Sequence, residues 1–125
     1  MAPTIPAASA PRVATISYRG GAFVSGERAV PAEVAIAISI DGSTHAVMMA
    51  TPDHVEELGL GLALNERIVA SRAEIERIEV VETELGLDCQ IRLSDARGAT
   101  YTARRRQMTG PVGCGLPPAR FRVVR

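Results

Sequence analysis

The residue with the clearest chemical potential in this 125-residue chain is Cys114, which has a glycine on each side in the stretch Thr109-Gly-Pro-Val-Gly-Cys-Gly-Leu116. Flanking glycines leave the thiol unshielded and let backbone N–H groups approach the sulfur, which stabilises a thiolate. A thiolate is the form that attacks a persulfide or a disulfide. Cys114 is therefore a candidate for receiving and handing on sulfur. The alternative, from composition alone, is an unreactive thiol in a loose tail.

Three consecutive arginines, Arg104, Arg105 and Arg106, precede this cysteine. Guanidinium groups add positive potential near a thiolate and bind phosphate groups in bidentate fashion, so the triplet is a candidate cofactor-binding site. We expect it to end a strand over 99–108, where alternate residues point to opposite faces. At most Arg104 and Arg106 then share a face, and a solvated strand edge is an equal alternative.

The remaining cysteine and the histidines give weaker chemical signals. Cys89 lies in an apolar strand pattern and is predicted to be a buried structural residue, because a free cysteine behaves as a small hydrophobe. Two cysteines do not make a secreted disulfide framework. His45 and His54 have no cysteine or carboxylate at metal-ligand spacing, so we expect no metal site.

Composition predicts one small domain with an aliphatic core, because 46% of residues are apolar but only 3% are aromatic. A net charge of zero gives no pull toward nucleic acid or an anionic membrane. All 14 basic residues are arginine, which excludes Schiff-base chemistry on a lysine. No apolar run reaches the roughly 20 residues of a membrane span, and the N-terminus lacks a signal-peptide pattern. A cytoplasmic location is expected.

Turn and strand signals organise the first half of the chain. Residues 1–12 read as a flexible N-terminal tail, residues 13–18 as a first strand, and the glycines at 20, 21 and 26 as a loop. The β-branched run 34–40 and the run 45–50 predict a β-hairpin around Asp41-Gly42. The alternative prediction is a longer loop that also includes Ser43 and Thr44.

A helix is predicted directly after this hairpin. Thr51 is the expected N-cap and Pro52 the first helical residue, with the end near Asn65. Gly59 and Gly61 weaken a helix, so together they indicate that another element packs closely against it.

Two further strands, 75–82 and 87–93, are predicted to join across Gly86, followed by the strand over 99–108. The expected fold class is α+β: a small, mostly antiparallel sheet with a helix after a β-hairpin. We expect an α+β domain over 13–108 and a cysteine-bearing loop with a divergent tail over 109–125.

Several ordered motifs resemble the FdhD/NarQ family of formate dehydrogenase accessory sulfurtransferases. The family carries an Asn/Asp-Gly turn followed by Met-Ala-Thr-Pro at a helix start, similar to Asp41-Gly42 and Met49-Ala-Thr-Pro52 here. Its Ile-x-x-Ile-x-Val strand is similar to Ile75 to Val80. Its Cys-Gly-x-Cys-Gly motif is similar to Cys114-Gly115-Leu116.

The resemblance implies a sulfurtransferase, or sulfur carrier. Such proteins take persulfide sulfur from a cysteine desulfurase and pass it to the molybdenum bis(molybdopterin guanine dinucleotide) cofactor, as formate dehydrogenase activity requires. The persulfide position of the motif matches Cys114. The resemblance also implies a homodimer, with cysteine desulfurase and formate dehydrogenase as partners.

Three departures from the family pattern bear on activity. Pro117 stands where the second cysteine belongs, and Arg67 replaces the usual glycine after Glu66. The family's C-terminal domain of cytidine-deaminase-like fold is absent from this sequence, and the tail after Leu116 diverges, which we interpret as a frameshift or truncation. The alternative function is therefore a non-catalytic remnant or interaction module without cofactor binding.

Overall fold

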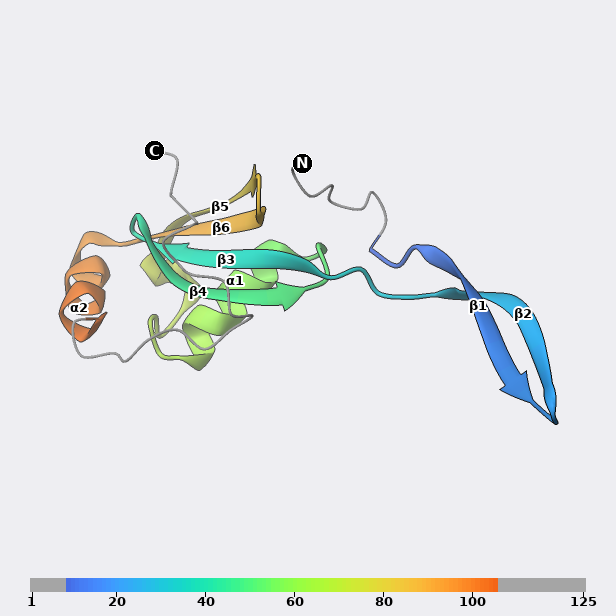
Figure 1. Ribbon diagram of the computed structural model, residues 1–125. Helices are drawn as coiled ribbons and strands as arrows, with labels where there is room; N and C mark the ends of the chain where they lie inside the picture. The colour runs from blue at the N-terminus through green and yellow to red at the C-terminus, as the bar shows by residue number, and fades with distance from the viewer. Residues whose placement is uncertain (1–8, 106–125) are drawn as a thin grey trace.

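The computed structural model describes residues 9–105, which form two separate sheets and two α-helices (Figure 1). The larger sheet has the strand order β4-β3-β6-β5, in which β3 and β6 run parallel and the other pairs are antiparallel. The strands of this sheet are β3 (Val34–Ile40), β4 (Ser43–Ala50), β5 (Ile75–Thr83) and β6 (Gly86–Leu93). The expected α+β class, with a mostly antiparallel sheet and a helix after a β-hairpin, is confirmed.

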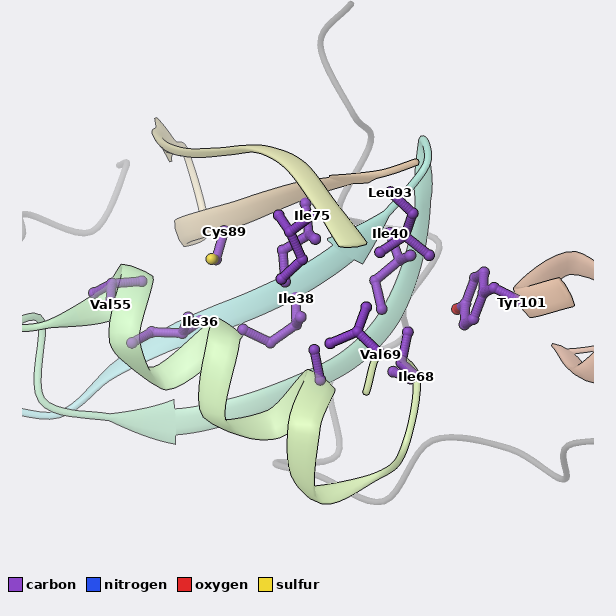
Figure 2. Close-up of a cluster of buried hydrophobic side chains, with 12 residues drawn as sticks. Ile36, Ile38, Ile40, Val55, Ile68, Val69, Ile75, Cys89, Leu93 and Tyr101 are labelled. Atoms are coloured by element: carbon purple, nitrogen blue, oxygen red, sulfur yellow. The ribbon is translucent and has the colours of Figure 1, made fainter. Parts of the chain in front are cut away.

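Strand β3 is the centre of the domain because it is paired on both sides and buried on both faces. Its isoleucines, Ile36, Ile38 and Ile40, are fully buried and point toward helix α1 (Val55–Asn65), where Figure 2 shows them in the main hydrophobic cluster. Its alanines, Ala35 and Ala37, point to the opposite face, because side chains alternate along a strand. The core of the described residues is mainly aliphatic, as the composition predicts, with Tyr101 as its one aromatic member.

The turn between β3 and β4 is the two-residue Asp41-Gly42 loop, since Ile40 pairs directly with Ser43. Both loop residues have positive φ, 47° and 85°, which is the requirement of the type I′ turn that Asp-Gly favours. The longer loop is therefore wrong.

Helix α1 begins at Val55, one turn later than the sequence predicts. Thr51 makes no cap, Pro52 lies before the helix, and the N-cap is His54 in a left-handed conformation with φ of 51°. The chain uses residues 51–54 to cross from the edge strand β4 to the helix layer, and this path overrides the local capping signal. The predicted end at Asn65 is confirmed.

Gly59 is the point at which α1 meets the sheet. A Cβ on this residue would lie 2.5 Å from Cys89 Sγ and 3.4 Å from Ile91 Cδ1, so only glycine allows this approach. Gly61 has no atom within 4 Å of its Cβ position. The expectation of close packing is therefore confirmed for Gly59 and wrong for Gly61.

The strand predicted over 99–108 is wrong for residues 99–105, because Asp95–Arg105 form helix α2, and the rest of it lies outside the described residues. The run from Ser94 to Arg105 is rich in alanine and arginine, which have high helix propensity, and Asp95 favours the positive end of the helix dipole. The helix begins with a hydrogen bond from the Gly98 N–H to the Ser94 carbonyl.

A hairpin of β1 (Arg12–Arg19) and β2 (Ala22–Ala29) forms the second sheet and extends away from the larger one (Figure 1). The expected first strand is present, but the expectation that Gly26 marks a loop is wrong, since it lies within β2 and pairs with Thr15. Most of the expected N-terminal tail, residues 1–8, lies outside the described residues.

The contact between Gly59 and Cys89 gives a direct test of this packing. Gly59→Ala should lower the free energy of unfolding by about 1–3 kcal/mol, because the added methyl overlaps the Cys89 sulfur. The matched control Gly61→Ala should raise it by about 0.5–1 kcal/mol, since the helix gains propensity without a clash. Urea denaturation of both variants checks the pair, and equal effects would contradict the packing.

Candidate functional site

Cys89 is fully buried in β6 and faces helix α1, as the sequence predicts for a structural cysteine (Figure 2). Burial raises the pKa of its thiol from 9.0 to about 11, and the carboxylates of Asp88 and Glu56 add to the increase. The thiol is therefore protonated at neutral pH. A buried, protonated thiol is neither an accessible nor a nucleophilic sulfur.

A polar cluster lies on the other face of the sheet, next to this cysteine. The Asp88 carboxylate is fully buried and accepts hydrogen bonds from the Ser39 hydroxyl at 2.7 Å and the Gln90 side-chain amide at 3.2 Å. These bonds satisfy the buried carboxylate and connect the two central strands. We interpret this cluster as a structural hydrogen-bond network.

Helix α2 is attached to the domain through His45. The imidazole, with a side chain only 5% exposed, contacts the Tyr101 hydroxyl through Nδ1 at 2.9 Å and the Glu66 carboxylate through Nε2 at 2.5 Å. A carboxylate only accepts, so Nε2 donates to Glu66, and in the neutral ring Nδ1 then accepts from the tyrosine hydroxyl. This chain of bonds joins β4, the end of α1 and α2.

Two arginines of α2 form a second attachment to the loop after α1. Arg97 donates to the Ile68 carbonyl at 2.6 Å and the Arg67 carbonyl at 3.3 Å, and it also lies 3.4 Å from the Glu74 carboxylate. Arg104 donates to the same Arg67 carbonyl at 3.1 Å. Arg67 itself adopts a left-handed φ of 59°, in the position where the family resemblance leads us to expect glycine.

The structure brings together only part of the predicted site. Arg104 lies near the end of α2 and donates a hydrogen bond to a backbone carbonyl, and Arg105 is the last residue of that helix, so the expectation that these two arginines lie on a strand is wrong. Cys114 and Arg106 lie outside the described residues. The described part of the chain shows how the helix that precedes Cys114 in sequence is held, and the role of Cys114 remains a prediction.

Sequence reasoning missed His45, Glu66 and Tyr101 as a connected group. They are separated by 21 and 56 residues from His45, so no local spacing marks them. The one available signal was Tyr101 itself, one of only two tyrosines in the chain and the only aromatic residue of α2.

Within residues 9–105, no group of three or more His, Cys, Asp or Glu side chains is arranged to hold a metal ion. No helix in that part of the chain is long and apolar enough to cross a membrane.

Comparison with known proteins identifies related sequences. A model of the FdhD/NarQ family matches residues 31–124. The chain is 52% identical over 109 residues to the sulfur carrier protein FdhD of Agrobacterium fabrum, covering 87% of this chain and 40% of that protein. It is 45% identical over 101 residues to the sulfur carrier protein FdhD of Brucella abortus, covering 81% and 38%. The chain thus spans about two fifths of the length of these relatives.

A solved structure has a similar fold. It is that of a protein from Desulfotalea psychrophila described as a formate dehydrogenase accessory protein, with a TM-score of 0.58 and 19% identity. The match covers 69% of this chain and 38% of that one. At this identity the likeness shows the fold alone.

The raised pKa of Cys89 predicts a loss of stability in alkali. A thiol whose folded pKa is raised contributes its full stability below the unfolded pKa of 9.0 and loses it as pH rises toward about 11. The stability difference between the chain and its Cys89→Ala variant should therefore fall by about 1 kcal/mol from pH 8 to pH 10. Both chains should carry Cys114→Ser, and a difference that does not change with pH would contradict the burial of the thiol.

Proposed function

This chain belongs to the FdhD/NarQ family, and we propose that it is a sulfur carrier that serves the maturation of formate dehydrogenase, with Cys114 as the residue that holds the sulfur. The observation that carries the proposal is the family match over residues 31–124, which extends through the Gly113-Cys114-Gly115 segment. The relatives of high identity are themselves sulfur carrier proteins.

The two cysteines of the chain support this assignment by contrast. Cys89 is buried with a raised pKa, so its sulfur is unsuited to attack. Cys114 has glycine neighbours that leave room for backbone N–H groups near the sulfur. Sulfur transfer requires a thiolate, and this requirement favours Cys114.

The loading step follows thiol–disulfide exchange. The Cys114 thiolate attacks the outer sulfur of a persulfide on a cysteine desulfurase, and a new S–S bond forms to the Cys114 sulfur. The S–S bond of the donor breaks, and the desulfurase cysteine leaves as a thiolate. No oxidant is needed, because one S–S bond replaces another.

The substrate that receives the sulfur is, in this proposal, the molybdenum bis(molybdopterin guanine dinucleotide) cofactor of formate dehydrogenase. Its phosphate groups suit arginine side chains, and Arg104, Arg105 and Arg106 remain the candidate contacts. Arg104 already donates to the Arg67 carbonyl, so it would have to bind phosphate with its remaining N–H groups. The proposed partners are a cysteine desulfurase and formate dehydrogenase. In this proposal the protein acts as a homodimer in the cytoplasm.

Helix α2 has a defined part in this proposal. Its bonds to the loop carbonyls of Arg67 and Ile68, and the Tyr101–His45 contact, attach the helix that precedes Cys114 in the sequence to the sheet domain.

Sulfur loading tests the proposal directly. After incubation with a cysteine desulfurase and cysteine, the intact mass should rise by one sulfur atom, and a reducing agent should remove that mass. Cys114→Ser should abolish the increase, because the attacking thiolate is lost. The matched control Cys89→Ala should still load sulfur, provided that circular dichroism shows a folded chain. Loading that survives Cys114→Ser, or no loading of the folded chain, would refute the assignment.

Function in cells is a separate measurement. In a strain that lacks its own full-length carrier, expression of this chain should restore formate dehydrogenase activity, and Cys114→Ser should not. Loading without rescue would favour an interaction module over a working carrier. It would indicate that the chain accepts sulfur but does not bind the cofactor that should receive it.

A further inference from the structure

The β1–β2 hairpin holds exposed aromatic side chains in a chain that has very few aromatics. Two of the four Phe and Tyr residues of the chain, Tyr18 and Phe23, lie near the tip of the hairpin. They are 65% and 77% exposed, and the centroids of their rings are 5.1 Å apart. Ile16 beside them is 74% exposed. The hairpin contributes nothing to either hydrophobic cluster of the described residues and extends away from the sheet domain (Figure 1).

The two faces of the hairpin differ in chemistry. Because paired residues of antiparallel strands share a face, the register assigns eight residues to each face. The apolar face has four rows from tip to base: Tyr18 with Phe23, Ile16 with Ser25, Ala14 with Glu27, and Arg12 with Ala29. The opposite face has the rows Arg19 with Ala22, Ser17 with Val24, Thr15 with Gly26, and Val13 with Arg28.

An isolated two-stranded hairpin is marginally stable in water and needs packing on its apolar face. We propose that the apolar face of this hairpin packs against the same face of a second copy of the chain, in antiparallel orientation. This names the surface of the homodimer in the proposed function, although the packing does not depend on sulfur chemistry.

Size complementarity supports a second copy as the occupant. An antiparallel, two-fold arrangement places each strand over its own counterpart, so the tip rows of one hairpin face the base rows of the other. Phe23 then faces Ala29 and Ile16 faces Ala14, so a large side chain meets a small one in both pairs. Alternation of large and small side chains lets two sheet faces interdigitate.

The polar residues of the face are complementary in the same arrangement. Tyr18 faces Arg12, whose guanidinium can stack on the ring, and Ser25 faces Glu27, whose carboxylate can accept from its hydroxyl. Arg12 and Glu27 form an ion pair within each copy at 3.2 Å, so the face is electrically neutral. Two such faces meet without repulsion.

The opposite face does not have this property. It carries Arg19 and Arg28 without an acidic residue, so two copies of it would repel each other. The charge pattern thus selects one of the two faces for self-association.

The area of the face predicts a weak dimer. Ile16, Tyr18 and Phe23 together expose about 400 Å² per copy, given the surface that such side chains bury when packed. Two copies therefore bury about 800 Å² from these residues and more from their neighbours, at the low end of specific interfaces. We expect a monomer–dimer equilibrium with a dissociation constant on the order of 10 µM.

Analytical ultracentrifugation of the full chain, under reducing conditions, measures this equilibrium. Phe23→Glu should raise the dissociation constant at least about tenfold, because it puts a charge into the apolar face. The matched control Val24→Glu changes the next residue of the same strand, which points to the opposite face, and should leave the constant within about twofold.

Cross-linking tests the orientation with two conservative variants. In a Cys114→Ser background, Ser25→Cys places a thiol on the apolar face near the two-fold axis, and Ser17→Cys places one on the opposite face. A short bismaleimide linker should join two Ser25→Cys chains and should not join two Ser17→Cys chains. The cross-linking result depends neither on disulfide formation between the introduced cysteines nor on sulfur carrier activity.

Three outcomes would overturn the proposal. A chain that stays monomeric at millimolar concentration would show that the apolar face does not bind a second copy, so a different protein would have to cover it. Equal effects of Phe23→Glu and Val24→Glu would place self-association on another surface. Open-ended polymers in place of dimers would exclude the two-fold arrangement.

Discussion

The parallel pairing of β3 with β6 is the constraint on which the rest of the domain depends. It joins residues 35–40 to residues 86–91, so the chain between them must cross over one face of the sheet. Helix α1 is part of that crossover and covers the isoleucine side of β3. The same pairing makes β3 and β6 the interior strands and leaves β4 and β5 at the edges.

The different environments of the two central strands explain why Cys89 is inert. Its position in β6 directs the sulfur toward α1, where Gly59 provides space for the atom and little more. The neighbouring Asp88 points to the other face and binds Ser39 of β3. Burial on one side and a carboxylate on the other both disfavour the thiolate, so the architecture that stabilises the sheet also removes this cysteine from the chemistry of the chain.

Sequence reasoning succeeded where a local signal and the tertiary structure agree. The run Val34–Ile40 and the Asp41-Gly42 turn carry enough information for a hairpin, because β-branched residues and a type I′ turn act over a few positions. It failed where the path of the chain through the fold determines where a helix or strand begins and ends. Thr51 has the correct type for an N-cap, yet the chain has not reached the helix layer at that point. Gly26 looks like a loop residue, but cross-strand pairing with Thr15 keeps it in β2.

The candidate site shows the same division. The glycines around Cys114 are a local feature that sequence can identify, and Cys89 was correctly recognised as buried. The attachment of α2 is not local, since His45 reaches Glu66 and Tyr101 from a different strand. The strand predicted for the arginine triplet is wrong for Arg104 and Arg105, which lie in α2, a helix that includes Gly98. That glycine has a tertiary reason, since a Cβ there would lie 2.6 Å from Asp41 Oδ2 in the β3–β4 turn.

The two sheets differ in the kind of apolar side chain that they carry and in its exposure. The larger sheet is covered by aliphatic residues such as Ile36 and Ile38, and Tyr101 is the one aromatic side chain in its main hydrophobic cluster among the described residues. The hairpin instead exposes Tyr18 and Phe23, residues that bury large areas at interfaces and lose little conformational entropy on doing so. Their exposure is costly for an isolated chain, and it becomes favourable once a complementary face covers them. The family model begins at residue 31, after the hairpin ends, but the match to the Agrobacterium fabrum relative covers 87% of the chain and therefore includes strand β2. The hairpin is thus part of the sequence that this relative resembles, and its exposed face is a feature to be explained together with the rest of the domain.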